Sequence, residues 1–190
     1  YLVIPKVSSE RREYLPIGFE QPSTLCSDLV FIVPGATLYH FGVLSSAMHN
    51  AWLRAVCGRL KSDFRYSAAI VYNHFPWPEL PGDAPSGSPA QRARAAIEAA
   101  AQAVLDARTR FQQGPQPATL ADLYDPLTMP PELRRAHQRL DAAVDAAYAL
   151  SGGPRRYASD AQRVAHLMQC HQRLTSLLPT QRHQRLRHSA

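Results

Sequence analysis

Cysteine is scarce in this sequence, with three residues in 190, and no two of them lie close together. The positions of Cys26, Cys57 and Cys170 exclude a Cys-x-x-Cys metal or redox motif, so we expect free, mostly buried thiols in a reducing compartment. No apolar run reaches the ~18 uninterrupted residues of a membrane span. The start lacks a basic segment followed by an apolar one, so we expect no signal peptide. These absences predict a cytoplasmic protein without membrane contact.

Catalytic signatures are missing as well. The sequence contains no Gly-x-Ser-x-Gly elbow, no phosphate-binding loop, no Gly-x-Gly-x-x-Gly and no Asn-Pro-Pro-Tyr tetrapeptide. The nearest approach to a metal site is His166, Cys170 and His171. On a helix the first two lie one turn apart and His171 points elsewhere, so the group offers too few ligands for zinc. A packed cysteine beside surface histidines is the favoured interpretation.

Lysine is nearly absent, since Lys6 and Lys61 are the only lysines among 21 basic residues. The formal net charge is +6 and the isoelectric point is about 9.5. A basic balance permits an anionic partner, although a GC-rich genome explains part of the arginine bias. The first residue is Tyr1, inside a strand-like run, which suggests a fragment of a longer protein with any catalytic parts upstream.

Residues 1–80 combine strand and helix patterns. We expect strands in four runs rich in β-branched and aromatic residues: 2–4, 14–19, 29–33 and 68–72. Residues 8–13 are polar and predict a hairpin loop. Residues 38–60 are mostly apolar and predict one long, buried helix that ends near Gly58.

The second half has a different character. Clustered prolines and glycines predict a linker over residues 81–89, and the remaining chain predicts a helical domain over 90–178. Its three helices are expected at 89–113, 131–150 and 159–178, the first and last opening on capping boxes at Ser88 and Ser159. The basic tail, 179–190, is expected to be disordered. The predicted fold class is α+β: a small mixed or antiparallel β region with one long buried helix, followed by a C-terminal three-helix bundle.

Three alternating charges form the sharpest functional signal. Lys61, Asp63 and Arg65 occupy every second position, so in an extended strand they would line one edge. Lysine donates to guanine O6 and N7, and aspartate accepts from cytosine N4, so the first two could read one G·C pair. Arg65 could reach an adjacent base or a phosphate. The alternative is a surface ion pair of little energetic value.

Other basic and aromatic residues are weaker candidates. Arg11 and Arg12 could contact phosphate or form a solvated loop tip. Polar side chains recur every fourth residue along the long helix and could face phosphate or the helical region: Ser46, Asn50 and Arg54. Phe75 and Trp77 could stack on a base, but their flanking prolines favour anchoring of the linker to the core.

Several segments, taken together in order, carry a family resemblance. They include Gly58-Arg-Leu-Lys-Ser-Asp-Phe-Arg-Tyr-Ser67, Phe41-Gly-Val-Leu-Ser-Ser-Ala-Met-His49 and Leu120-Ala-Asp-Leu-Tyr-Asp-Pro-Leu-Thr-Met-Pro-Pro-Glu-Leu133. The segments within residues 4–78 resemble the target-recognition domain of MmeI-like DNA methyltransferases, the type IIL restriction-modification family. Those within 120–148 resemble that family's C-terminal helical domain. The match is collinear and covers nearly the whole chain.

The resemblance implies a role and a set of residues. In that family one polypeptide binds S-adenosylmethionine and methylates the N6 amino group of adenine, and many members carry a nuclease domain. This sequence lacks the cofactor-binding and Asn-Pro-Pro-Tyr segments, so the resemblance implies the C-terminal part of a recognition domain without a cofactor of its own. The family's base-reading positions fall on Lys61, Asp63 and Arg65. A second determinant falls on Leu29, which can make only apolar contacts.

The leading hypothesis is therefore a sequence-specific DNA-recognition portion of a bacterial adenine methyltransferase. Its expected partners are double-stranded DNA and an upstream methyltransferase domain of the same polypeptide. Base reading is expected from Lys61, Asp63, Arg65 and Leu29, and phosphate contact from a second set: Arg11, Arg12, Asn50 and Arg54. The alternative is a non-catalytic protein-interaction module of strands and three helices with no DNA contact. Whether the fragment has any enzymatic activity stays open, and its lack of catalytic motifs makes a stand-alone enzyme the least favoured hypothesis.

Overall fold

A small antiparallel sheet forms the N-terminal end of the molecule in the computed structural model, which describes residues 1–176. Strand β1 (Leu2–Pro5) lies between β3 (Gly18–Phe19) and β4 (Val30–Val33), giving the order β3-β1-β4. Along β1 the buried residues alternate with partly exposed ones, as expected for a strand with one face on the core. The predicted strands at 2–4 and 29–33 are confirmed, whereas only the last two residues of 14–19 form a strand.

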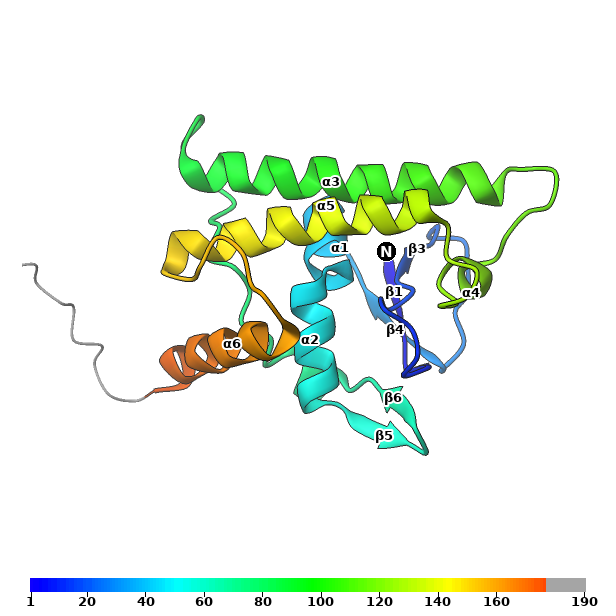
Figure 1. Cartoon of the computed structure of the whole chain (residues 1–190), viewed down its shortest axis with the longest axis horizontal. Helices are drawn as coiled ribbons and strands as arrows, with labels where there is room; N and C mark the ends of the chain where they lie inside the picture. The colour runs from blue at the N-terminus through cyan, green and yellow to red at the C-terminus, as the bar shows by residue number, and fades with distance from the viewer. Residues whose placement is uncertain (177–190) are drawn as a thin grey trace, which may run out of the picture.

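A second antiparallel sheet has the order β2-β6-β5, with β2 at Val7–Ser8, β5 at Gly58–Leu60 and β6 at Asp63–Arg65. Strands β5 and β6 form a hairpin, and β6 also pairs with β2. Figure 1 shows this hairpin at the end of α2, projecting beyond the helices. Because β1 and β2 belong to different sheets, the chain turns at Lys6 and connects the sheet of β1 to the hairpin.

The predicted long helix over 38–60 is wrong in two respects, because it is broken at Ser46 and ends at Val56. Helix α1 covers Leu38–Ser45 and α2 covers Ala47–Val56, and Ser46 between them has the extended angles φ −79° and ψ 162°. A residue distant in sequence caps the N terminus of α2, since the Ala47 N–H donates to Asp141 Oδ1 at 2.7 Å. An acceptor at this position caps a helix N terminus.

The predicted strand at 68–72 is also wrong, because Ala68–Tyr72 forms a single π-helical turn, η1. The Ser67 hydroxyl accepts from the Ile70 N–H at 3.3 Å and begins this turn. The buried indole N–H of Trp52 donates to the Val71 carbonyl at 3.0 Å and fixes the turn against α2. Ile70 and Val71 favour strands by type, but here their backbone groups bond to the Ser67 hydroxyl and the Trp52 indole instead of to a neighbouring strand, so the segment forms a helical turn.

The C-terminal half is helical, as predicted. Its elements are α3 (Pro89–Gln112), α4 (Leu120–Leu123), α5 (Pro131–Tyr148), the short 3-10 helix η2 (Ala149–Ser151) and α6 (Asp160–Thr175). The Ser88 and Ser159 hydroxyls accept from the Gln91 and Gln162 N–H groups, so both predicted N-caps are present. The predicted capping boxes do not close, because the two glutamine side chains accept from the Gly87 and Ala158 N–H groups, one residue before each cap. The predicted basic tail, 179–190, lies outside the described residues. No helix within residues 1–176 is both long and apolar enough to cross a membrane.

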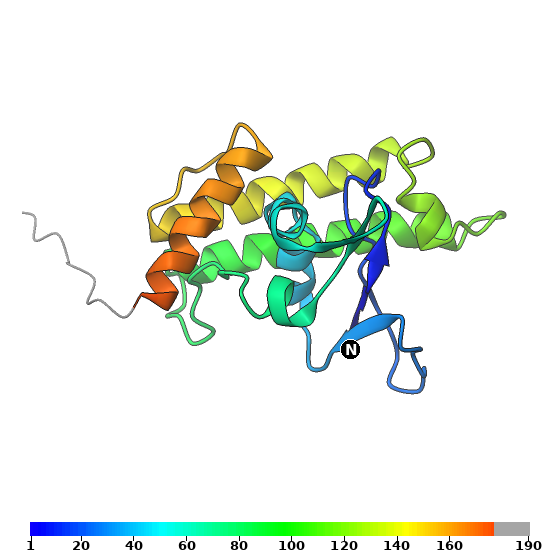
Figure 2. The same cartoon turned by 90° about the horizontal axis from the view of Figure 1, so that it is seen from below.

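The three long C-terminal helices do not form a bundle by themselves. Helices α3 and α5 pack as an antiparallel pair, with α1 against both, whereas the main helix contact of α6 is with α2. Figure 2 shows α6 crossing the end of this pair. The α+β class is confirmed, and the helices of the N-terminal half pack directly against those of the C-terminal half.

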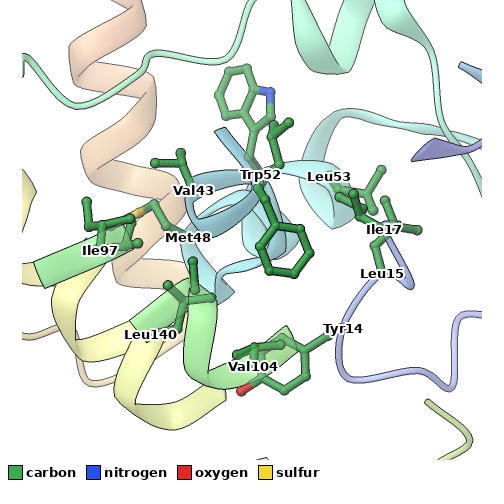
Figure 3. Close-up of a cluster of buried hydrophobic side chains, with 14 of the residues drawn as sticks. Tyr14, Leu15, Ile17, Val43, Met48, Trp52, Leu53, Ile97, Val104 and Leu140 are labelled. Carbon is green, nitrogen blue, oxygen red and sulfur yellow. The ribbon is translucent and has the colours of Figure 1, made fainter. Parts of the chain in front are cut away.

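The core is continuous between the two halves. Figure 3 shows Met48 of α2 beside Ile97 of α3 and Leu140 of α5, all fully buried. Helix α1 approaches α3 closely at Gly42, where an added Cβ would lie 2.7 Å from Ile97 Cγ2. A side chain at that position would separate the helices, so the glycine permits their contact.

A buried polar network also joins the two halves. The Tyr14 hydroxyl donates to Asp141 Oδ2 at 2.7 Å, and the Tyr14 ring stacks on His137 with centroids 4.1 Å apart. His137 Nε2 and the Tyr124 hydroxyl are 2.7 Å apart, and Arg108 Nε donates to that hydroxyl at 2.7 Å. Burial, and secondarily the Arg108 charge, hold the pKa of His137 well below its ordinary value, which favours the neutral ring.

Candidate nucleic-acid interface

The β5–β6 hairpin closes through a two-residue turn, Lys61–Ser62, because Leu60 pairs with Asp63. Lys61 has φ +56°, the only positive φ of a non-glycine residue among residues 1–176. This left-handed conformation costs a side-chain-bearing residue free energy. Lys61 therefore lies at the exposed tip of the hairpin, and the predicted straight row of three charges is bent at its first member.

The remaining two charges do share one face. Asp63 and Arg65 are two residues apart on β6, so their side chains point to the same side of the sheet. Asp63 is half-buried and Arg65 is exposed, and the residues paired with Arg65 are Gly58 of β5, which has no side chain, and Val7 of β2. The opposite face carries Phe64, which is buried in the molecule. The outer face of the hairpin therefore presents a carboxylate and a guanidinium, with an ammonium at its tip.

Leu29 lies close to this hairpin although it is remote in sequence. Lys6 connects them through its backbone, since its N–H donates to the Leu29 carbonyl at 2.9 Å and its carbonyl accepts from the Tyr66 N–H at 2.8 Å. Leu29 is 69% exposed, so its apolar side chain is available at the surface. Lys6 thus links residue 29 to Tyr66, which directly follows β6 at the end of the hairpin opposite the Lys61 tip.

The predicted phosphate contacts differ in their accessibility. Arg11 is exposed and Arg12 is half-buried, in the loop that follows β2. Arg54 on α2 is half-buried, and its Nη1 donates to Asp160 Oδ2 at 2.8 Å while its Nη2 donates to the Glu13 carbonyl. Arg54 therefore already has an acidic partner from α6.

The burial of Asn50 contradicts the prediction that it contacts phosphate. Its side chain is inside the molecule, where Oδ1 accepts from the Leu15 N–H at 2.9 Å and Nδ2 donates to the Ser46 carbonyl at 2.8 Å. Ser46 is buried as well and donates to the Val43 carbonyl. The polar stripe on this helix faces inward, and it orders the irregular segment before β3.

The aromatic residues after η1 anchor the chain to the core, as predicted. Phe75 is buried, and Trp77 is half-buried with its ring centroid 5.6 Å from that of Phe75 and 6.1 Å from that of Tyr39. These contacts hold the start of the linker and leave neither ring free to stack on a base.

Two residues were missed by sequence reasoning. His49 is fully buried and lies 3.2 Å from the Tyr66 hydroxyl, and burial lowers its pKa to about 3, so the ring stays neutral. Arg59 contacts both the hairpin turn and the loop after β2. A two-residue turn at Lys61–Ser62 pairs Leu60 with Asp63 and hence Arg59 with Phe64, so the turn is the sequence signal that predicts this position.

The histidines and cysteine of α6 occupy different environments. Cys170 Sγ lies 3.4 Å from His166 Nε2 and accepts from Arg173 Nη2 at 3.0 Å, whereas the His171 ring packs 5.9 Å from Trp52. Within residues 1–176 no three His, Cys, Asp or Glu side chains are grouped as metal ligands would be.

Comparison with known proteins agrees with this arrangement. Residues 1–79 match the family described as MmeI, target recognition domain, and residues 88–179 match MmeI, C-terminal domain. The class defined by fold and site is thus a DNA target-recognition domain joined to a helical C-terminal domain. DNA methyltransferase A of Bacillus subtilis (strain 168) is 41% identical over 174 residues, which is 92% of this chain. The chain belongs to the MmeI family.

A solved structure has the same fold. The type IIL restriction-modification enzyme MmeI in complex with DNA superposes with a TM-score of 0.79 and 44% sequence identity, over 93% of this chain. The chain spans about a fifth of the length of these relatives, 18% of the methyltransferase and 21% of MmeI.

Proposed function

We propose that this chain selects the DNA sequence at which an adenine-specific methyltransferase acts. The observation that carries the proposal is the projecting β5–β6 hairpin, which presents Lys61, Asp63 and Arg65, with the exposed Leu29 near its base. A two-stranded ribbon fits the major groove of B-DNA. A solved relative, MmeI, is in complex with DNA, and residues 1–79 of this chain match the MmeI target recognition domain.

Each side chain has a distinct proposed role in the groove. The Lys61 ammonium donates to guanine O6 and N7, and the Asp63 carboxylate accepts from cytosine N4, so the pair specifies one G·C base pair. Arg65 reads or supports a neighbouring base pair, and Leu29 makes apolar contact there. Arg11 and Arg12 contact phosphate and set the position of the hairpin on the duplex, whereas Arg54 is held by Asp160 and the Glu13 carbonyl.

The rest of the function belongs to the whole polypeptide. We place the recognition domain at residues 1–80, the linker at 81–89 and the helical domain at 90–178. An upstream domain would bind S-adenosylmethionine and transfer its methyl group to an adenine N6, with the adenine flipped out of the duplex, in the bacterial cytoplasm. The present sequence contains no Gly-rich cofactor loop and no Asn-Pro-Pro-Tyr, so no step of methyl transfer is assigned to its residues.

The test exchanges the two residues that specify the G·C pair. The double variant K61D/D63K, in the whole protein that contains this chain, should change one base of the methylated sequence and leave methylation otherwise intact. Sequencing of methylated sites in a random-sequence library measures the change. An unaltered site would refute the assignment of these two residues.

A salt titration distinguishes DNA reading from the protein-interaction alternative. DNA affinity should fall steeply between about 50 and 200 mM salt if several phosphates are contacted. R11Q and R12Q should each reduce the slope of log K against log salt by about one, equally for all sequences. Affinity that is indifferent to both salt and sequence would favour an interface with a protein.

A further inference from the structure

The inner face of the β5–β6 hairpin carries a basic residue that is turned away from the proposed DNA surface. Arg59 pairs with Phe64 across the hairpin, so the two side chains share the face opposite to Asp63 and Arg65. The Arg59 guanidinium lies over the Phe64 ring, 4.3 Å from its centroid. Phe64 is buried, which fixes the ring and so fixes the surface on which the guanidinium rests.

The same guanidinium connects the hairpin tip to a neighbouring loop. Arg59 Nη1 donates to the Ser62 carbonyl at 2.8 Å and to Glu10 Oε2 at 3.1 Å. Ser62 belongs to the turn and Glu10 to the loop after β2. Among the described residues, Arg59 provides the only side-chain hydrogen bond to the Lys61–Ser62 turn.

The turn needs such support because Lys61 adopts φ +56°. A residue with a Cβ is less stable in this conformation, so surrounding contacts must maintain it. A base contact also requires that the backbone carrying the side chain be held to within about 0.5 Å. The Lys61 side chain is itself long and flexible, so movement of the turn would add to its own movement. A fixed turn therefore keeps the ammonium within reach of guanine.

We propose that Arg59 is a positioning residue for base reading by Lys61, and this inference rests on the proposed function. Its guanidinium holds the Ser62 carbonyl, and thereby the left-handed conformation at Lys61, while Glu10 and Phe64 hold the guanidinium. A lysine could not replace it fully, because an ammonium has no planar group to lie on the Phe64 ring and so is not held in place between the two oxygens. A phosphate contact is disfavoured for Arg59, since the Glu10 carboxylate would repel the phosphate.

The experiment compares R59K and R59Q in the whole protein that contains this chain. Both variants should lose about tenfold in discrimination at the base pair read by Lys61 and Asp63, which is part of the roughly 5- to 150-fold that one bidentate base contact supplies. Affinity for the cognate site should fall by the same factor of about ten, whereas affinity for sites that differ at this base pair, and discrimination at other positions, should change by about twofold or less. Sequencing of methylated sites and competition binding with single-base-pair variants measure both.

A matched pair of variants controls for the loss of an exposed ion pair. Arg110 forms one with Glu132, between α3 and α5 and away from the hairpin, so R110K and R110Q should leave discrimination unchanged. Thermal unfolding of all four variants should differ little, because exposed ion pairs contribute about 0–1 kcal/mol.

Three results would overturn the inference. If R59K behaves as wild type and R59Q weakens binding equally for all sequences, Arg59 is a phosphate contact. If both variants keep full discrimination while K61D/D63K changes the methylated site, the proposed function stands and the positioning role fails. If K61D/D63K itself leaves the site unchanged, the base assignment fails, and the role of Arg59 fails with it.

Discussion

The carboxylate of Asp141 should make the stability of the chain depend on pH between about 4 and 6. This side chain links the two halves of the molecule, accepting from the Tyr14 hydroxyl and the Ala47 N–H, each at 2.7 Å. Burial raises its pKa from 3.8 to about 6, and Asp145 adds to the rise, while both hydrogen bonds and the Arg163 charge oppose it. The protonated form is therefore favoured in the folded state relative to the unfolded chain.

The sign and size of the effect follow from this difference. Between pH 4 and 6 the folded chain binds a proton at Asp141 more tightly than the unfolded chain does, so this contribution to stability is present below pH 4 and lost as pH rises through 6. A shift of about two pKa units corresponds to about 3 kcal/mol at neutral pH. D141N removes the charge but keeps an oxygen for the Ala47 N–H and an amide group for the Tyr14 oxygen.

Urea denaturation of wild type and D141N, followed by tryptophan fluorescence from pH 4 to 8, measures the difference. The stability of D141N relative to wild type should increase by about 2–3 kcal/mol from pH 4 to pH 7.5, because titrations common to both proteins cancel. Y14F removes a donor that lowers the pKa of Asp141, so the pH range over which the Y14F protein loses stability should lie higher than in wild type. A difference between D141N and wild type that is flat with pH would refute the reasoning.

Three further substitutions test the turn, the helix contact and the π-helical turn. K61G should reduce discrimination at one G·C pair to the part supplied by Asp63, yet keep or raise stability by about 1 kcal/mol, because glycine adopts a positive φ without a Cβ penalty; methylated-site sequencing and denaturation measure these separately. G42A places a Cβ 2.7 Å from Ile97 Cγ2 and should cost about 1–3 kcal/mol of unfolding free energy by overpacking. W52F leaves the Val71 carbonyl without its indole donor and should cost about 1–3 kcal/mol, measured by thermal unfolding.

The sequence predicted best what depends on neighbours in the chain. The caps at Ser88 and Ser159 involve residues three positions apart, and both are present. The break between α1 and α2 at Ser46 could not be predicted in this way, because the acceptor that caps the N terminus of α2 is Asp141, which lies 94 residues after Ala47. That Asn50 faces the core could not be predicted for a similar reason, since the backbone N–H that it accepts from belongs to Leu15, in a separate segment.

The candidate site shows the same division. The alternation at Asp63 and Arg65 correctly predicted a strand with both charges on one face. Lys61 continues that alternation in sequence but leaves the strand, since a Lys-Ser turn carries no glycine or asparagine to signal a positive φ. The nearness of Leu29 follows from backbone bonds of Lys6, which no local pattern contains.

The projecting hairpin has a consequence for how the recognised sequence can change over evolution. Its proposed base-reading side chains stand on a tip and an outer face, whereas Phe64, beneath them, is buried. Exposed substitutions away from strained backbone generally alter stability by less than about 0.5 kcal/mol, so residues 29 and 65 can vary without disturbing the core, while the positive φ restricts the choice at residue 61. A lineage could therefore acquire a new DNA target in one or two mutational steps, with no compensating changes elsewhere in the fold.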